Sequence, residues 1–119
     1  MYLPLTTYLT QAVERTIIRE LIEGMEDFNL SFSVNDGEDE SPRCLTWVSL
    51  QRHLFTTDDE TIIVHNKGAA IGWIKLVYGN DAGETVISNY TTNLEKYMRR
   101  GLDAADAIEH GKFKIEVLK

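Results

Sequence analysis

Three strand-like segments follow one another between residues 61 and 90, and the short turns between them restrict the folds open to the chain. Residues 61–64 are β-branched throughout, and residues 71–78 and 85–90 resume the pattern after turns at 66–68 and 79–83. Parallel strands need a crossover connection of about a dozen residues or more, which these turns are too short to supply. The segments therefore predict an antiparallel meander.

An amphipathic helix is predicted before this meander. Its apolar residues fall within one half of a helical wheel: Val13, Ile17, Ile18, Leu21, Ile22 and Met25. This periodicity indicates a helix that begins near Thr6 or Thr10 and ends at residues 24–27. Glu14 interrupts the apolar arc. We interpret it as a rim position whose carboxylate reaches water, with a functional or interface acid as the alternative.

A second helix is predicted after the meander. Thr92 and Glu95 have the spacing of a capping box. The apolar residues that follow share one side: Leu94, Tyr97, Met98, Leu102, Ala105 and Ile108. Gly111 is a stop signal, and residues 112–119 alternate in the manner of an added edge strand.

Two further segments complete the predicted architecture. Apolar residues alternate with polar ones over 28–34, which predicts a strand that ends at the turn signal 35–37. Residues 45–55 fit a short helix, but Thr46, Trp47 and Val48 are equally typical of a strand. The expected fold is a single α+β domain over 1–119, with an antiparallel sheet of four to five strands and two long helices packed on one face.

The negative charge of the chain is concentrated near its beginning. Residues 1–41 hold nine acidic and two basic side chains and so account for the whole formal net charge of −7. Such a chain is repelled by phosphate backbones, which argues against direct nucleic-acid binding. We predict a partner-binding surface on one helix face and one loop: Glu20, Glu23, Asp27, Asp36, Glu38, Asp39 and Glu40. The alternative is that these charges serve solubility, with residues 36–40 forming an extended, solvated loop.

The side chains that usually carry catalysis or metal binding show no recognisable constellation. Cys44 is the single cysteine, so it has no disulfide partner and is expected to be a buried apolar residue. His53, His65 and His110 have no histidine or cysteine three or four positions away, and we interpret them as structural or solvent-facing. We therefore expect no catalytic residues, no metal and no cofactor.

The remaining sequence features concern compartment and packing. No run approaches the roughly 20 apolar residues that span a bilayer, and residues 1–9 do not resemble a signal peptide. We expect a cytoplasmic protein that does not bind membranes. Gly72 is expected to let an aromatic ring lie against bare backbone. Trp73 is interpreted as a core residue of the sheet.

Residues 71–81 read IGWIKLVYGND and residues 86–94 read VISNYTTNL. This pattern resembles small proteins encoded by bacteriophages, prophages and related mobile elements, which share a GWxxxVYGND…VIxxYTxNL signature. The match covers about residues 58–95 and leaves out the acidic first third. The resemblance implies a genomic setting in which small acidic proteins bind and disable host machinery, and it implies the cytoplasm of a host bacterial cell.

Three hypotheses follow from these features. The first is a non-enzymatic protein that inhibits a host nucleic-acid-binding defence enzyme, anti-CRISPR-like or antirestriction-like, by covering its basic surface with acidic side chains. The alternative is a structural or regulatory phage accessory protein that acts as a homodimer through an edge strand or a helix. A small enzyme is the third, and it would require a pocket that pairs His53 or His65 with a carboxylate.

Overall fold

A computed structural model describes residues 5–79 and 86–109 of the chain. The elements follow in the order α1 (Leu5–Glu26), β1 (Ser31–Asn35), α2 (Trp47–Leu50), the 3-10 helix η1 (Gln51–His53), β2 (Asp59–Asn66), β3 (Ala69–Val77), β4 (Ile87–Tyr90), the 3-10 helix η2 (Thr92–Tyr97) and α3 (Arg99–Glu109). The expected α+β class is confirmed. Residues 45–55, left open between helix and strand, contain α2 and η1 and are helical from Trp47 to His53.

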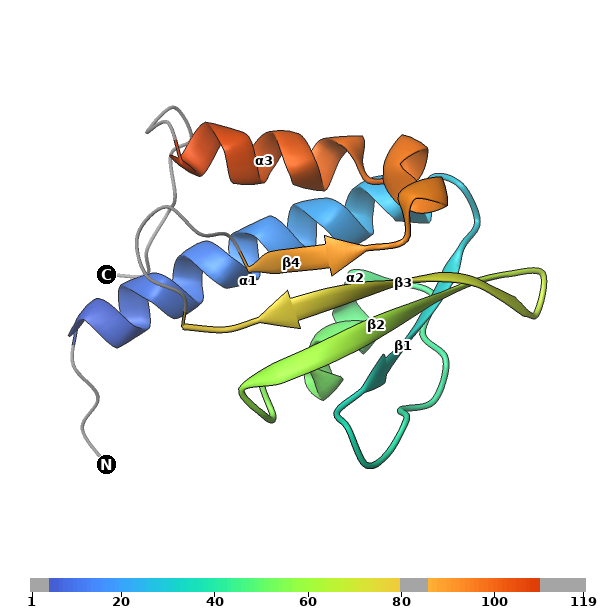
Figure 1. Cartoon of the computed structure of the whole chain (residues 1–119), viewed down its shortest axis with the longest axis horizontal. Helices are drawn as coiled ribbons and strands as arrows, with labels where there is room; N and C mark the ends of the chain where they lie inside the picture. The colour runs from blue at the N-terminus through green and yellow to red at the C-terminus, as the bar shows by residue number, and fades with distance from the viewer. Residues whose placement is uncertain (1–4, 80–85, 110–119) are drawn as a thin grey trace.

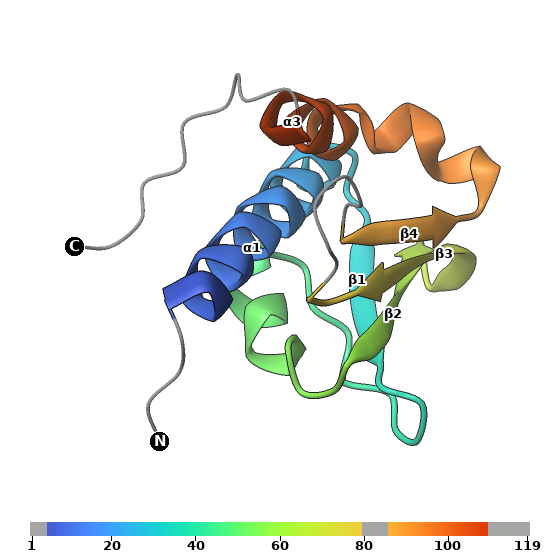
Figure 2. The same cartoon turned by 60° about the vertical axis from the view of Figure 1, so that its left-hand side comes forward.

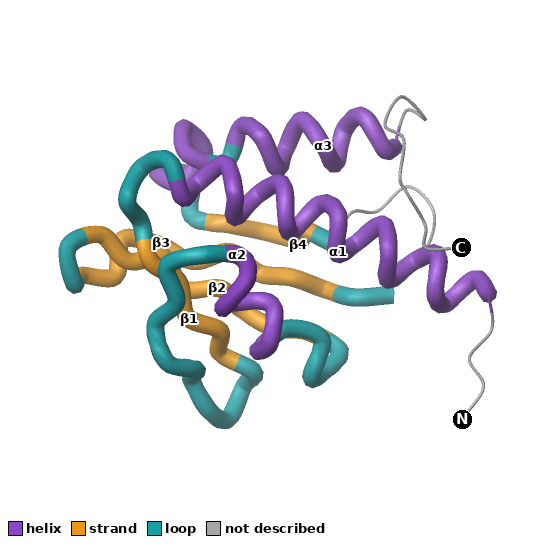
Figure 3. Tube along the Cα trace, turned by 180° about the vertical axis from the view of Figure 1, so that it is seen from behind, coloured by secondary structure: helices purple, strands orange, loops and turns teal. Residues whose placement is uncertain are grey.

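The four strands form one antiparallel sheet in the order β1-β2-β3-β4, which confirms the meander (Figure 1). Helices α1 and α2 lie on the same face of this sheet, as the view from behind shows (Figure 3). Helix α3 packs mainly against α1 and crosses it (Figure 2). Within residues 5–79 and 86–109, helices therefore cover one face of the sheet and leave the other face without a helix.

The core lies between α1 and the covered face of the sheet. The apolar arc of α1 is buried as predicted from Ile17 to Met25. Inward-facing strand residues meet it: Phe32, Val34, Ile62, Val64, Ile74 and Leu76. The crossing of α1 and α3 is close, because a methyl group added at Gly101 would lie 2.6 Å from the Cα atom of Leu21.

Strand β1 begins later than the alternation predicted. Phe28 and Asn29 belong to the turn after α1, and Asn29 has a φ of 58°, a left-handed conformation that interrupts an extended strand. Phe28 is half exposed and packs edge-on against Tyr97. Ser33 also departs from the expected alternation, because it is fully buried although it points away from α1.

The predicted capping box at Thr92 is wrong. Residues 92–97 form η2, and the α-helix begins only at Arg99. The preceding Thr91 directs its hydroxyl to the sheet, where it accepts a hydrogen bond of 3.1 Å from the Trp73 amide. Both Thr91 and Leu94 pack on the bare backbone of Gly72, so the aromatic ring expected there is absent from its nearest contacts. His110, Gly111 and residues 112–119 lie outside the described residues.

Candidate functional site

The acidic loop, residues 36–40, is a closed turn rather than the extended loop expected. The carboxylate of Asp36 accepts hydrogen bonds of 2.9 Å from the amides of both Glu38 and Asp39. The amide of Asp36 in turn donates to the carbonyl of Asp39. These backbone bonds, led by the one from Asp39, lower the pKa of the Asp36 carboxyl because they stabilise its charged form.

The chain that follows the loop returns along β1. Isolated bridges pair Asn35 with Glu40 and Phe32 with Cys44. Cys44 is buried in this segment, as predicted. The loop is thus anchored at both ends, by β1 on one side and by the returning segment on the other.

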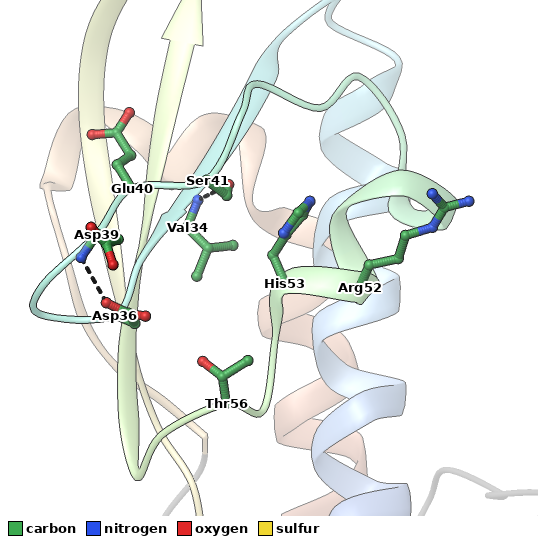
Figure 4. Close-up of a pocket in the computed structure, with 8 residues that line it drawn as sticks. All are labelled: Val34, Asp36, Asp39, Glu40, Ser41, Arg52, His53 and Thr56. Atoms are coloured by element: carbon green, nitrogen blue, oxygen red, sulfur yellow. Dashed lines mark hydrogen bonds between the residues drawn. The ribbon is translucent and has the colours of Figure 1, made fainter.

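Glu38, Asp39 and Glu40 are exposed on this loop, whereas Asp36 is partly buried. A shallow pocket of about 200 Å³ lies between the loop and η1 (Figure 4). Its lining comprises Val34, Asp36, Asp39, Glu40, Ser41, Arg52, His53 and Thr56. The guanidinium of Arg52 points away from the acidic loop in Figure 4, so the carboxylates set the charge on their side of the pocket.

The other acidic residues predicted for the partner surface lie elsewhere. Arg100 of α3 binds Glu20 at 2.5 Å and Glu23 at 3.2 Å across the α1–α3 interface. Asp27 is exposed in the turn after α1. Helix α3 and the acidic loop lie on opposite sides of the molecule in both Figure 1 and Figure 2. The seven predicted residues therefore do not form one surface.

Two buried carboxylates were not recognised from the sequence as a site. Glu60 is 2% exposed and accepts hydrogen bonds from the Phe55 amide at 2.9 Å, from the amide and hydroxyl of Thr56 at 3.1 and 2.5 Å, and from the Tyr78 hydroxyl. Glu14 is 5% exposed, and its Oε2 accepts a bond of 2.7 Å from the Gly79 amide. The rim interpretation of Glu14 is therefore wrong. We call Glu14, Glu60 and Tyr78 the inner carboxylate cluster.

Aromatic rings pack beside this cluster. The ring of Tyr78 stacks on Phe55 with centroids 4.4 Å apart, and the guanidinium of Arg15 lies 4.7 Å above the Phe55 ring. Burial, the hydrogen bond to Glu60 and the Glu60 charge all raise the pKa of Tyr78 above its ordinary value. Phe55 itself has a φ of 63°. The cluster thus holds a strained loop residue and the end of β3 in place.

A third polar group lies on the face of the sheet that no helix covers. His65 of β2 is 4% exposed, and its Nε2 atom lies 3.0 Å from the Ser33 hydroxyl. Ser33 also donates a hydrogen bond of 2.9 Å to Glu40 Oε2. In a Ser-His-Asp triad the carboxylate binds the imidazole. Here it binds the serine, so the connections do not match that arrangement.

The described part of the chain contains neither a cluster of metal-binding side chains nor a membrane-spanning helix. Across residues 5–79 and 86–109, no three or more histidine, cysteine, aspartate or glutamate side chains are placed to hold a metal ion. Within the same ranges, no helix combines the length and the apolar character needed to cross a bilayer.

Comparison with protein-family models, with curated proteins and with solved structures finds no match to this chain. The resemblance of residues 58–95 to phage and mobile-element proteins stays a prediction. Any argument for function rests on the surface of the molecule itself.

Proposed function

We propose that this chain is a non-enzymatic phage or mobile-element protein that binds and inhibits a host nucleic-acid-binding defence enzyme through its acidic loop. The observation that supports the proposal is the arrangement of three exposed carboxylates, Glu38, Asp39 and Glu40, on a turn that Asp36 holds closed. A turn ordered before binding loses little conformational entropy when a partner docks. Its carboxylates match the lysine and arginine side chains that normally hold phosphates.

The acidic loop supports this role better than the acidic face of α1 does. Glu20 and Glu23 are already paired with Arg100, so a partner cation would have to compete with an internal one. The loop also lies close in sequence to Leu45 and Val48, which are 69% and 64% exposed. Leu45 precedes the N-cap residue Thr46, and Val48 lies in the first turn of α2. An interface centre is typically apolar with a polar rim, and these two side chains supply exposed apolar area.

The inhibition we propose needs no reaction. Carboxylates that occupy a basic groove block the phosphates that the groove would otherwise bind, and long-range attraction speeds the encounter. Because salt screens exposed charges over about 8–10 Å, binding of this kind weakens as ionic strength rises.

The test is affinity capture of host proteins at low and high salt, followed by competition with nucleic acid for the captured protein. Wild type is compared with the double variant E38K/D39K and with the matched control E95K/D103K, whose exposed acids lie outside the loop. We expect the control to retain a nucleic-acid-binding protein and to displace its nucleic acid, and the loop variant to do neither. Equal behaviour of the two variants, or capture that is insensitive to salt, contradicts the proposal.

The homodimer alternative has one observation in its favour, since β4 is the last strand of the sheet order and so a terminal strand. Against it, β4 has only four residues, and the Tyr90 amide is already bonded to the Asn89 side chain at 2.9 Å. Short edge strands with occupied amides are poor templates for pairing. Sedimentation at micromolar concentration distinguishes the two, because a stable dimer favours the accessory protein.

A further inference from the structure

The acidic loop is connected through the sheet to a buried histidine. Ser33 and His65 are diagonal neighbours on adjacent strands, because Ser31 pairs with His65 and Ser33 pairs with Ile63. Both side chains lie on the face opposite α1. Glu40 reaches back from the loop to the Ser33 hydroxyl, so the chain of contacts runs from an exposed loop residue to an imidazole that is 4% exposed.

The direction of each hydrogen bond in this chain follows from donor and acceptor capacity. An ionised carboxylate only accepts, so the single Ser33 hydroxyl hydrogen is donated to Glu40. Ser33 must then accept at its contact with His65, which places the imidazole hydrogen on Nε2. The other ring nitrogen, Nδ1, keeps a bare lone pair, and it is buried without a hydrogen-bond partner among the described residues.

We propose that Glu40, Ser33 and His65 form a latch that fastens the acidic loop to the sheet and opens when His65 takes up a proton. The added proton goes to Nδ1, for which the described part of the chain supplies no acceptor. The resulting imidazolium is buried with a donor at Nδ1 that has no acceptor, and burying an unsatisfied donor of a charged group is costly. Relief requires the ring to move toward water, and that movement breaks the bond between His65 and Ser33.

Two charged groups face His65 and act in opposite directions. The guanidinium of Arg43, in the returning segment, disfavours the protonated ring, whereas Glu40 favours it. Burial is the largest influence, and together with Arg43 it lowers the pKa of His65 below the ordinary histidine value of about 6.5. The latch is therefore closed at neutral pH, where the ring is uncharged.

The pH dependence follows from the direction of this shift. The unfolded chain binds the histidine proton more readily than the folded protein does. The contribution of His65 to stability is thus complete above pH about 6.5 and declines as the pH falls toward the lower folded pKa. The loop is expected to loosen in the same window, because the Ser33 hydroxyl that orients Glu40 is then no longer held by His65.

A consequence for binding rests on the proposed function. If the loop carboxylates contact a basic partner, opening of the latch disperses them, and affinity falls in mild acid. The latch itself does not depend on any partner, so it is measured on the protein alone.

The experiment follows the His65 pKa and the amide hydrogen exchange of residues 36–44 by NMR between pH 7.5 and pH 5. Wild type is compared with His65→Gln, which can keep an N–H donor toward Ser33 but does not titrate, and with Ser33→Ala, which removes the middle of the latch. After correction for intrinsic exchange, we expect several-fold faster exchange at pH 5 in wild type and no pH effect in the glutamine variant. The alanine variant is expected to exchange fast at both pH values.

Several results overturn the latch. These are a His65 pKa at or above 6.5 in the folded protein, equal loop protection at the two pH values in wild type, or wild-type protection in Ser33→Ala. If His65→Gln does not fold, the wild-type titration and the serine variant decide the question. Failure of the capture experiment with an intact latch refutes the proposed function alone.

Discussion

Carboxylates occupy two contrasting regions of this molecule, the inner carboxylate cluster and the acidic loop. Glu60 and Glu14 are buried and accept hydrogen bonds from backbone amides, whereas Glu38 and Asp39 are exposed on a turn that Asp36 stabilises. A buried carboxylate is tolerated only when hydrogen bonds replace its water, so the inner acids are bound to the fold. Glu38 and Asp39 are exposed to water and need no such hydrogen bonds, so a partner can reach them.

The sharpest test of this contrast is Glu60→Ala. It leaves the amides of Phe55 and Thr56 and the hydroxyl of Tyr78 without their acceptor, so we expect a loss of about 2–4 kcal/mol in the free energy of unfolding. Urea denaturation measures it. Glu38→Ala is the matched control and should leave the midpoint nearly unchanged. Similar urea midpoints for the two variants would contradict the distinction between the inner carboxylate cluster and the acidic loop.

Gly101→Ala tests the close helix crossing that accompanies the pairing of the α1 acids with Arg100. The added methyl group would lie 2.5 Å from the Cβ atom and 2.6 Å from the Cα atom of Leu21, so the helices must separate. Overpacking of this kind costs about 1–3 kcal/mol, measured by thermal or urea unfolding. Asp103→Ala, an exposed change on the same helix, is the control. A neutral Gly101→Ala would mean that α3 is loosely held and that its pairing with the acids of α1 is incidental.

Tyr78→Phe removes one of the bonds to Glu60 and is expected to cost about 1 kcal/mol at neutral pH. The pKa of Tyr78 is raised in the folded protein, so its contribution to stability is complete below the ordinary tyrosine pKa of about 10 and is lost as the pH rises above it. Wild type should therefore lose stability above pH about 10 more steeply than the phenylalanine variant. Urea denaturation at pH 9 and pH 11 measures the free energy of unfolding of both proteins. An equal loss between the two pH values in wild type and variant would show that the inner carboxylate cluster does not restrain this hydroxyl.

The parts of the fold that were predicted correctly follow from local sequence patterns, namely the spacing of apolar residues and the length of the turns. The apolar arc of α1 and the short turns between β2, β3 and β4 each reflect contacts between near neighbours in sequence, and these determine strand order and which faces are buried. The acidic loop was also located correctly, because the concentration of charge at residues 36–40 is visible in the sequence. Its closed shape was not, since the bonding of Asp36 to its own turn depends on backbone geometry.

The features that were missed depend on partners far apart in the chain. Glu14 interrupts an apolar arc and Glu60 precedes the inward-facing Ile62 by two positions, which are both signals of burial. Only the fold brings Gly79 to the first and Tyr78 to the second. The pairing of Glu20 with Arg100 likewise spans 80 positions, so charge counted along the sequence overstated the free acidic surface.

Arg100→Met is expected to have the smallest effect, and it tests whether the pairing of Glu20 and Glu23 with Arg100 reduces the free acidic surface. It keeps an apolar stem beside Gly24 but removes the guanidinium from Glu20 and Glu23. Arg100 is half exposed, so we expect a loss of about 0.2–1 kcal/mol that shrinks as salt is added. Unfolding at low and high salt measures it, with Arg99→Met as the neighbouring exposed control.

In the capture experiment this variant frees two acids on α1, so enhanced retention of the partner would move the binding surface from the loop toward α1. Unchanged retention supports the loop.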